Sequence, residues 1–135
     1  PSHIRENART FNLAYLYSYQ KRHQEVIGLL RNVEYSDVVY SLGSKMLLLR
    51  TYYELDELMA MDSLMDSFRI YVRRNKLISK ELKREYINFL YFLKKLSALS
   101  IGTPQAIAAF KKKVAASKNK TTKKWLLEKI EELER

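Results

Sequence analysis

The chain has 135 residues, with 25 Lys and Arg against 15 Asp and Glu, a formal charge of +10, and no cysteine. Its three Gly and two Pro compare with roughly sixteen at average usage, which argues against most β-rich folds and against Gly-rich phosphate loops. Without cysteine, disulfide scaffolds and Cys-ligated metal sites are excluded, and we expect one helical domain over residues 1–135.

Membrane and targeting signals are missing from this sequence. No apolar run approaches the about eighteen residues that a membrane span needs, and residues 1–9 lack the apolar core of a signal peptide. Because a cysteine-free chain is compatible with the cytosol, we expect a cytoplasmic protein. The chain begins with Pro rather than Met, which we interpret as a sign that it is part of a longer protein.

Helical spacing of apolar residues dominates the first half of the chain. It predicts helices over about 6–21 and 23–33, then a looser segment from Glu34 to Ser44 in which Gly43 turns the chain. A helix from Met46 to Glu54 follows. The next apolar stripe predicts a helix that ends near Asn75 and Lys76; its members are Leu58, Met61, Leu64, Met65, Phe68 and Val72.

Helix start signals are clearer in the second half. Ser79 is a candidate N-cap for a long helix that ends at Gly102, and Thr103-Pro104 is a strong start signal for the next one. The long helix carries an apolar stripe of Tyr86, Phe89, Leu90, Leu93 and Leu96. A break over 117–120 precedes a last amphipathic helix that carries Trp125, so we expect about seven helices and an all-α fold.

An internal repeat is visible when Tyr17 is placed over Tyr52, an offset of 35 residues. The matched pairs are then Leu13 with Leu48, Ala14 with Leu49, Val26 with Met61, Leu30 with Met65 and Val33 with Phe68. This pattern resembles the tetratricopeptide repeat, whose period is about 34 residues. Three runs also resemble the C-terminal regions of bacterial tetratricopeptide proteins without an assigned activity: Asp66–Arg69, Arg73–Lys76 and Trp125–Ile130.

The resemblance implies an α-solenoid of antiparallel helix pairs over about 6–33, 44–74 and 79–117, with a C-terminal capping helix over 121–134. Each pair in such a fold exposes an apolar face that the next pair covers. The resemblance also implies a non-catalytic scaffold that binds a peptide or protein partner. The implied groove positions are Phe11, Tyr15, Ser18 and Tyr19, then Met46, Arg50 and Tyr53.

Two interpretations of these groove positions stay open. Aromatic and Arg side chains are favoured anchors in protein interfaces, but they can also pack between neighbouring helices. A subgroup of the family grips C-terminal carboxylates with Lys and Asn residues. Ala8 and Leu47 stand at two of those positions, so the sequence argues against a carboxylate clamp.

Catalytic and metal-binding patterns are absent from the sequence. His3 and His23 have no Cys or carboxylate partner at metal-ligand spacing. The acidic residues between 51 and 68 are expected to lie on the solvent-exposed face of a helix pair. No Ser lies in the sequence pattern of a nucleophile elbow. We therefore expect no enzymatic activity, no cofactor and no metal.

The alternative function rests on lysines in the C-terminal half. Residues 86–127 contain nine lysines and no acid, and a cluster that could attract phosphate is formed by Lys111, Lys112, Lys113, Lys118, Lys120, Lys123 and Lys124. No known nucleic-acid motif accompanies them, and Phe110 and Trp125 fall on apolar faces rather than between the lysines. A solvated surface and an anionic protein, lipid or nucleic-acid partner all remain open.

Overall fold

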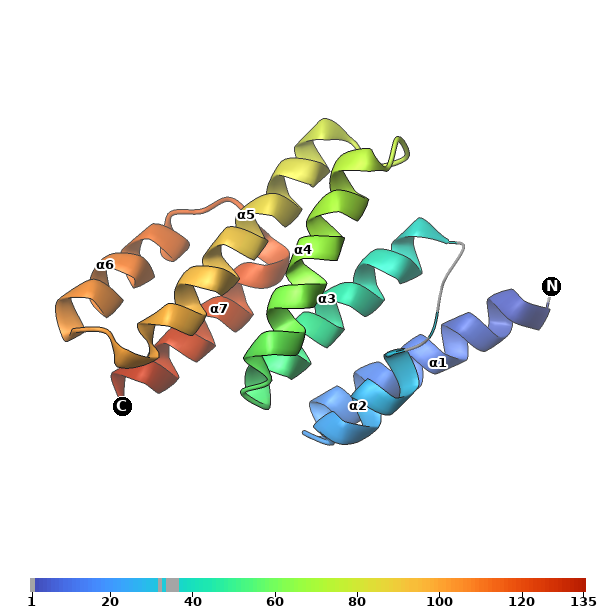
Figure 1. Cartoon of the computed structure of the whole chain (residues 1–135), viewed down its shortest axis with the longest axis horizontal. Helices are drawn as coiled ribbons and strands as arrows, with labels where there is room; N and C mark the ends of the chain where they lie inside the picture. The colour runs from blue at the N-terminus through green and yellow to red at the C-terminus, as the bar shows by residue number, and fades with distance from the viewer. Residues whose placement is uncertain (1, 32, 34–36) are drawn as a thin grey trace. The chain divides into compact units, whose positions relative to one another are not determined.

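The computed structural model describes the backbone of residues 2–31, 33 and 37–135, and the side chains of these residues except 2–4, 120 and 121. Regular structure in these residues is entirely helical, which confirms the all-α prediction. The helices are α1 (Ser2–Tyr19), α2 (His23–Leu30), α3 (Val38–Glu54), α4 (Leu58–Arg74), α5 (Lys80–Ala98), the 3₁₀ turn η1 (Leu99–Ile101), α6 (Pro104–Ala115) and α7 (Lys120–Glu134) (Figure 1).

The chain divides into two compact units, Pro1–Phe68 and Arg69–Arg135. None of the helices in the described part of the chain is long and apolar enough to cross a membrane.

Two of the helix starts lie where the capping residues predict them. The Ser79 hydroxyl accepts a hydrogen bond from the Leu82 amide at 3.1 Å, and the Thr103 hydroxyl accepts one from the Ala106 amide at 3.1 Å. Pro104 occupies the first turn of α6. A backbone N–H at this place has no acceptor within the helix, so Pro, which lacks the N–H, loses no hydrogen bond there. These contacts confirm both predicted N-caps.

The start of α3 differs from the prediction. The segment from Glu34 to Ser44 was expected to be loose, but α3 begins at Val38; residues 34–36 lie outside the described residues. The Asp37 carboxylate caps the helix by accepting hydrogen bonds from the Val39 and Tyr40 amides at 2.8 and 3.3 Å. A β-branched pair and Gly43 at the start of α3 concealed this helix, since both lower helix propensity.

Gly43 therefore lies inside a helix, where close packing accounts for it. A Cβ at this position would lie 2.9 Å from Cε2 and Cζ of the Phe11 ring, so the absence of a side chain lets the ring of α1 lie against the backbone of α3. Gly28 is exposed in α2, and a Cβ there would meet nothing within 4 Å.

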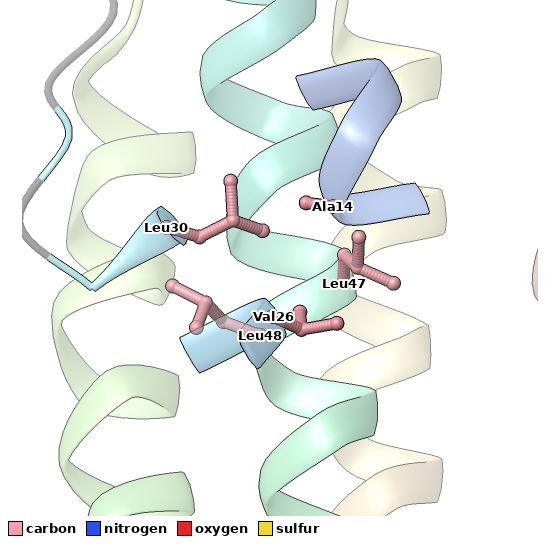
Figure 2. Packing of buried hydrophobic residues seen from close by; sticks show 5 residues of the cluster. All are labelled: Ala14, Val26, Leu30, Leu47 and Leu48. Atoms are coloured by element: carbon pink, nitrogen blue, oxygen red, sulfur yellow. The ribbon is translucent and has the colours of Figure 1, made fainter. Parts of the chain in front are cut away.

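The core of the first unit joins three helices. Ala14 of α1, Val26 and Leu30 of α2, and Leu47 and Leu48 of α3 form one buried cluster. Figure 2 shows these five side chains converging from the three helices. Partly buried side chains around the cluster include Tyr17 and Tyr52, the two residues that define the repeat offset. Since α1, α2 and α3 each contact the other two, the cluster lies where these three helices of the unit meet.

The second unit is built on aromatic contacts among α5, α6 and α7. Phe89 of α5 lies 6.3 Å from the Trp125 ring of α7, and Phe92 meets the Phe110 ring of α6 edge-on at 5.9 Å. The predicted stripe of α5 is buried at Phe89, Leu90, Leu93 and Leu96 and half-buried at Tyr86. The expected end of α5 at Gly102 is nearly correct, because the α-helix ends at Ala98 and one 3₁₀ turn continues to Ile101.

Candidate protein-interaction surface

The groove positions on α1 are partly exposed. Tyr19 is 86% exposed and Tyr15 is 49% exposed, while Phe11 and Ser18 are half-buried. The Phe11 ring lies against Gly43 on one side and contacts the Tyr15 ring at a centroid distance of 5.9 Å. This part of α1 therefore exposes two Tyr side chains. One of them, Tyr15, contacts the Phe11 ring, which itself packs against Gly43.

The groove positions on α3 are less accessible. Met46 is buried, with 8% of its surface exposed, and offers almost no area to a partner. Arg50 and Tyr53 are half-buried, and each already engages another group of the protein. The more exposed side chains among the predicted groove positions are thus those of α1.

Tyr40 joins this surface, although the sequence analysis did not identify it. Its ring meets Phe11 edge-on at a centroid distance of 5.6 Å, so Tyr40, Phe11 and Tyr15 form a continuous aromatic row across α3 and α1. Tyr40 was missed because its segment was expected to be a loop. The available signal was Asp37, an N-cap residue directly before an apolar run.

The turn after α1 has a defined geometry. Lys21 has φ = 60°, in the left-handed region that only Gly adopts without cost. The Arg22 amide donates to the Tyr17 carbonyl at 2.8 Å, and the Lys21 amide donates to the Ser18 carbonyl at 3.0 Å. These are the two hydrogen bonds of a Schellman motif. The Arg22 guanidinium also lies 4.1 Å from the centre of the Tyr17 ring, which holds the two ends of the motif together.

The turn after α3 repeats this geometry at an offset of 35 residues. Asp56 has φ = 58°. The Glu57 amide donates to the Tyr52 carbonyl at 2.8 Å, and the Asp56 amide donates to the Tyr53 carbonyl at 3.0 Å. Every donor and acceptor in this turn is therefore the counterpart of one in the turn after α1, and Tyr17 and Tyr52 occupy the same position in the two turns.

Side-chain burial follows the same offset within the two helix–turn–helix segments. Ala14 and Leu49 are fully buried, as are Val26 and Met61, and Leu30 and Met65 are 1% and 2% exposed. Two pairs break the pattern: Leu13 is 38% exposed and Leu48 is 6% exposed, and Val33 is half-buried whereas Phe68 is fully buried. Most matched positions thus have the same environment.

Two of the lysines proposed for anion binding are engaged within the second unit. The Lys111 ammonium donates to the Glu134 carboxylate at 2.8 Å. This hydrogen bond, with the negative charges of Glu134 and Glu131, raises the pKa of Lys111 above its ordinary value despite some opposing desolvation. The Lys123 ammonium donates to the Ser117 carbonyl near the end of α6 at 3.2 Å.

The other lysines of the cluster vary in exposure. Lys113 is exposed, and its ammonium lies 5.8 Å from the centre of the Tyr91 ring. Lys112, Lys118 and Lys124 are exposed to solvent. The side chain of Lys120 lies outside the described residues. Among the described lysines of the cluster, Lys111 and Lys123 thus have hydrogen-bond partners within the unit, whereas Lys112, Lys113, Lys118 and Lys124 are exposed.

Metal-ligating side chains do not converge in the part of the chain that the structure describes. No group of three or more His, Cys, Asp or Glu residues there is placed to hold a metal ion. His23 is the first residue of α2 and is half-buried. The side chain of His3 is outside the described residues.

Comparison of the chain with protein-family models, with curated proteins and with solved structures finds no match.

Proposed function

We propose that the chain is a helical-repeat interaction module, similar to tetratricopeptide proteins, that binds a peptide segment of another protein along α1 and the start of α3. In this proposal the helix pairs form a short α-solenoid, and the module has no catalytic role. Tyr15 and Tyr19 are the primary anchors, and Phe11 and Tyr40 support them.

The observation that carries the proposal is the equivalence of the two turns. Both contain a non-Gly residue with positive φ and the same pair of hydrogen bonds, displaced by 35 residues. Lys21 and Asp56 both have a positive φ, which only a small minority of non-Gly residues adopt. Their occurrence at matched positions would therefore be an uncommon coincidence in two unrelated turns. Shared turns and matched burial support two consecutive copies of one helix–turn–helix unit.

The chemistry of the exposed side chains supports peptide binding. Tyr side chains bring a large apolar ring and a hydroxyl at low entropic cost, which is why Tyr is enriched in protein interfaces. The aromatic row offers ring surface to aliphatic or aromatic side chains of a peptide, with its rings inclined to one another by 49° and 64°. The hydroxyls of Tyr15 and Tyr19 offer hydrogen bonds to the peptide backbone.

The proposal is tested with a peptide selected from a random display library on the intact chain. Its affinity is then measured by fluorescence anisotropy for the parent, for Tyr15→Ala and Tyr19→Ala, and for Arg50→Ala. Loss of one interface Tyr typically weakens binding by about 1–2 kcal/mol, or roughly 5–30-fold. Arg50→Ala is expected to have the smaller effect, because Arg50 is half-buried.

The matched control is Tyr91→Ala. Tyr91 is 49% exposed, the same fraction as Tyr15, but lies on α5. Equal losses for Tyr15→Ala and Tyr91→Ala, or no loss for either α1 variant, would exclude α1 as the peptide site. Binding of DNA or RNA that weakens steeply with salt and is lost on combined Lys112→Ala, Lys118→Ala and Lys124→Ala substitution would favour the alternative function.

A further inference from the structure

A tyrosine ring on the solvent-exposed side of α5 lies beside two ammonium groups. Tyr91 is 49% exposed. The Lys95 ammonium, one turn further along α5, lies 5.9 Å from the centre of this ring, and the Lys113 ammonium of α6 lies 5.8 Å from it. The two helices pack together through the Phe92 and Phe110 rings (Figure 1). Folding therefore places an aromatic ring among lysines, which the order of residues along the chain does not show.

Polar side chains extend this group along α5. Arg84 and Asn88 are exposed, and with Tyr91 and Lys95 they recur at the 3–4 residue spacing that marks one side of a helix. At a rise of about 1.5 Å per residue, Arg84 lies roughly 10 Å before Tyr91 along the helix axis and Lys95 lies roughly 6 Å after it. We call these four residues and Lys113 the tyrosine face.

The tyrosine face carries an excess of positive charge. No Asp or Glu occurs from residue 86 to residue 127, and the acids of α5, Glu81 and Glu85, lie in its first turns. The Glu134 carboxylate of α7 is bound by Lys111 at 2.8 Å. Because Lys113 projects roughly 160° away from Lys111 around α6, that carboxylate lies on another side of the helix. The charges around Tyr91 therefore favour an anionic ligand.

We infer that the tyrosine face binds single-stranded nucleic acid, with an unpaired base stacked on Tyr91 and the flanking phosphates bound by Lys95, Lys113 and Arg84. Proteins that bind single strands combine an aromatic stacking ring with a cationic track for the backbone. An ammonium on a flexible four-carbon stem turns readily from the ring to a phosphate, so the ring can accept a base. This inference goes beyond the proposed peptide site and does not rest on it.

The combination of ring and charge selects this class of ligand. A nucleotide carries a flat aromatic base and a phosphate joined through one sugar, whereas an acidic peptide or an anionic membrane offers charge without an adjoining base. A duplex keeps its bases stacked on one another, so only a single strand can present one to Tyr91. Asn88, one turn from Tyr91, adds a side-chain amide that can hydrogen-bond a base edge. The inference thus differs from the alternative function, which rests on the charge of the lysine cluster alone.

The test measures the affinity of the full chain for labelled single-stranded DNA and RNA of about 12 nucleotides by fluorescence anisotropy. We expect Tyr91→Ala to weaken binding by roughly 5–150-fold, the loss that follows removal of one stacking ring, and Tyr91→Phe to bind like the parent. Lys95→Ala and Lys113→Ala should each lower the slope of log affinity against log salt by about 0.7. The matched controls are Tyr15→Ala, equally exposed at 49% but on α1, and Lys124→Ala, an exposed lysine of α7. Both controls should leave affinity and slope unchanged.

Circular dichroism checks that the variants fold, and Tyr91→Ala should change stability little because exposed substitutions usually have small effects. If that variant does not fold, a ¹H–¹⁵N map of the parent chain titrated with the single strand decides instead, with the largest shifts expected at residues 88–95 and 113. The inference is overturned by shifts elsewhere, by the absence of binding at low salt, or by equal affinity of Tyr91→Ala and the parent. It is also overturned if Tyr91→Phe loses as much affinity as Tyr91→Ala, or if duplex DNA or phosphatidylserine vesicles bind as tightly as the single strand.

Discussion

Gly43 and Gly28 occupy helix interiors, but their surroundings are opposite. Gly43 lies under the Phe11 ring, and Gly28 faces open space. Helix propensity alone would favour Ala over Gly at both positions by about 1 kcal/mol. The contact between Phe11 of α1 and Gly43 of α3 therefore decides whether Ala at position 43 raises or lowers the free energy of unfolding. The same substitution at positions 28 and 43 separates the effect of packing from that of helix propensity.

We predict that Gly28→Ala raises the free energy of unfolding by about 0.5–1 kcal/mol, because propensity acts without steric opposition. Gly43→Ala should lower it by about 1 kcal/mol, since the added methyl group displaces the Phe11 ring from its seat. Urea denaturation of both variants checks this. Stabilisation by Gly43→Ala of the same size as that by Gly28→Ala would show that Phe11 does not depend on Gly43.

The turns after α1 and α3 act at the scale of the helix–turn–helix element. Each turn requires one residue in the left-handed conformation, which costs a non-Gly residue roughly 1–2 kcal/mol. Lys21 and Asp56 adopt this conformation in the two turns, so the cost falls on these residues. Asp bears less of it than Lys, because its short polar side chain tolerates the left-handed region.

We predict that Lys21→Gly stabilises the chain by about 0.5–1 kcal/mol, after the greater flexibility of Gly in the unfolded chain is subtracted. Asp56→Gly should give a smaller gain. Lys21→Ala is the control, since it removes the charge but keeps the Cβ, and it should give no gain. If thermal unfolding showed equal gains for Lys21→Gly and Lys21→Ala, charge rather than backbone conformation would be responsible.

Much of the element order could be predicted from local signals. Ser79, Thr103 and Pro104 located two helix starts, because capping acts within one turn of the chain. The start of α3 was missed because its cause is tertiary. Val38, Val39 and Gly43 are poor helix formers, and the Phe11 ring that packs against Gly43 comes from another helix.

The candidate surface was predictable only in part for the same reason. The resemblance to the tetratricopeptide repeat assigned Tyr15 and Tyr19 to a ligand-facing side of the first helix, and both side chains are exposed in the structure. Spacing could not reveal that Met46 is buried or that Tyr40 adjoins Phe11, since both depend on how helices pack. The equivalence of the two turns was also invisible, because neither Lys21 nor Asp56 is the Gly that usually marks such a turn.

At the scale of the whole molecule, two sets of side chains differ in chemistry. The aromatic row with Tyr19 offers rings and hydroxyls, and the lysine cluster offers positive charge. The net charge of +10 favours the lysine cluster only in a general way, since Lys111 and Lys123 already have partners. The cytoplasmic location expected from the sequence stays a prediction.

The most direct test of the central claim is a ¹H–¹⁵N chemical-shift map of the full chain, titrated with the peptide selected for binding. We predict that the largest shifts fall on the amides around Phe11, Tyr15, Tyr19 and Tyr40. Shifts concentrated instead in α6 and α7, around Lys112, Lys118 and Lys124, would contradict the claim that α1 and the start of α3 form the binding surface.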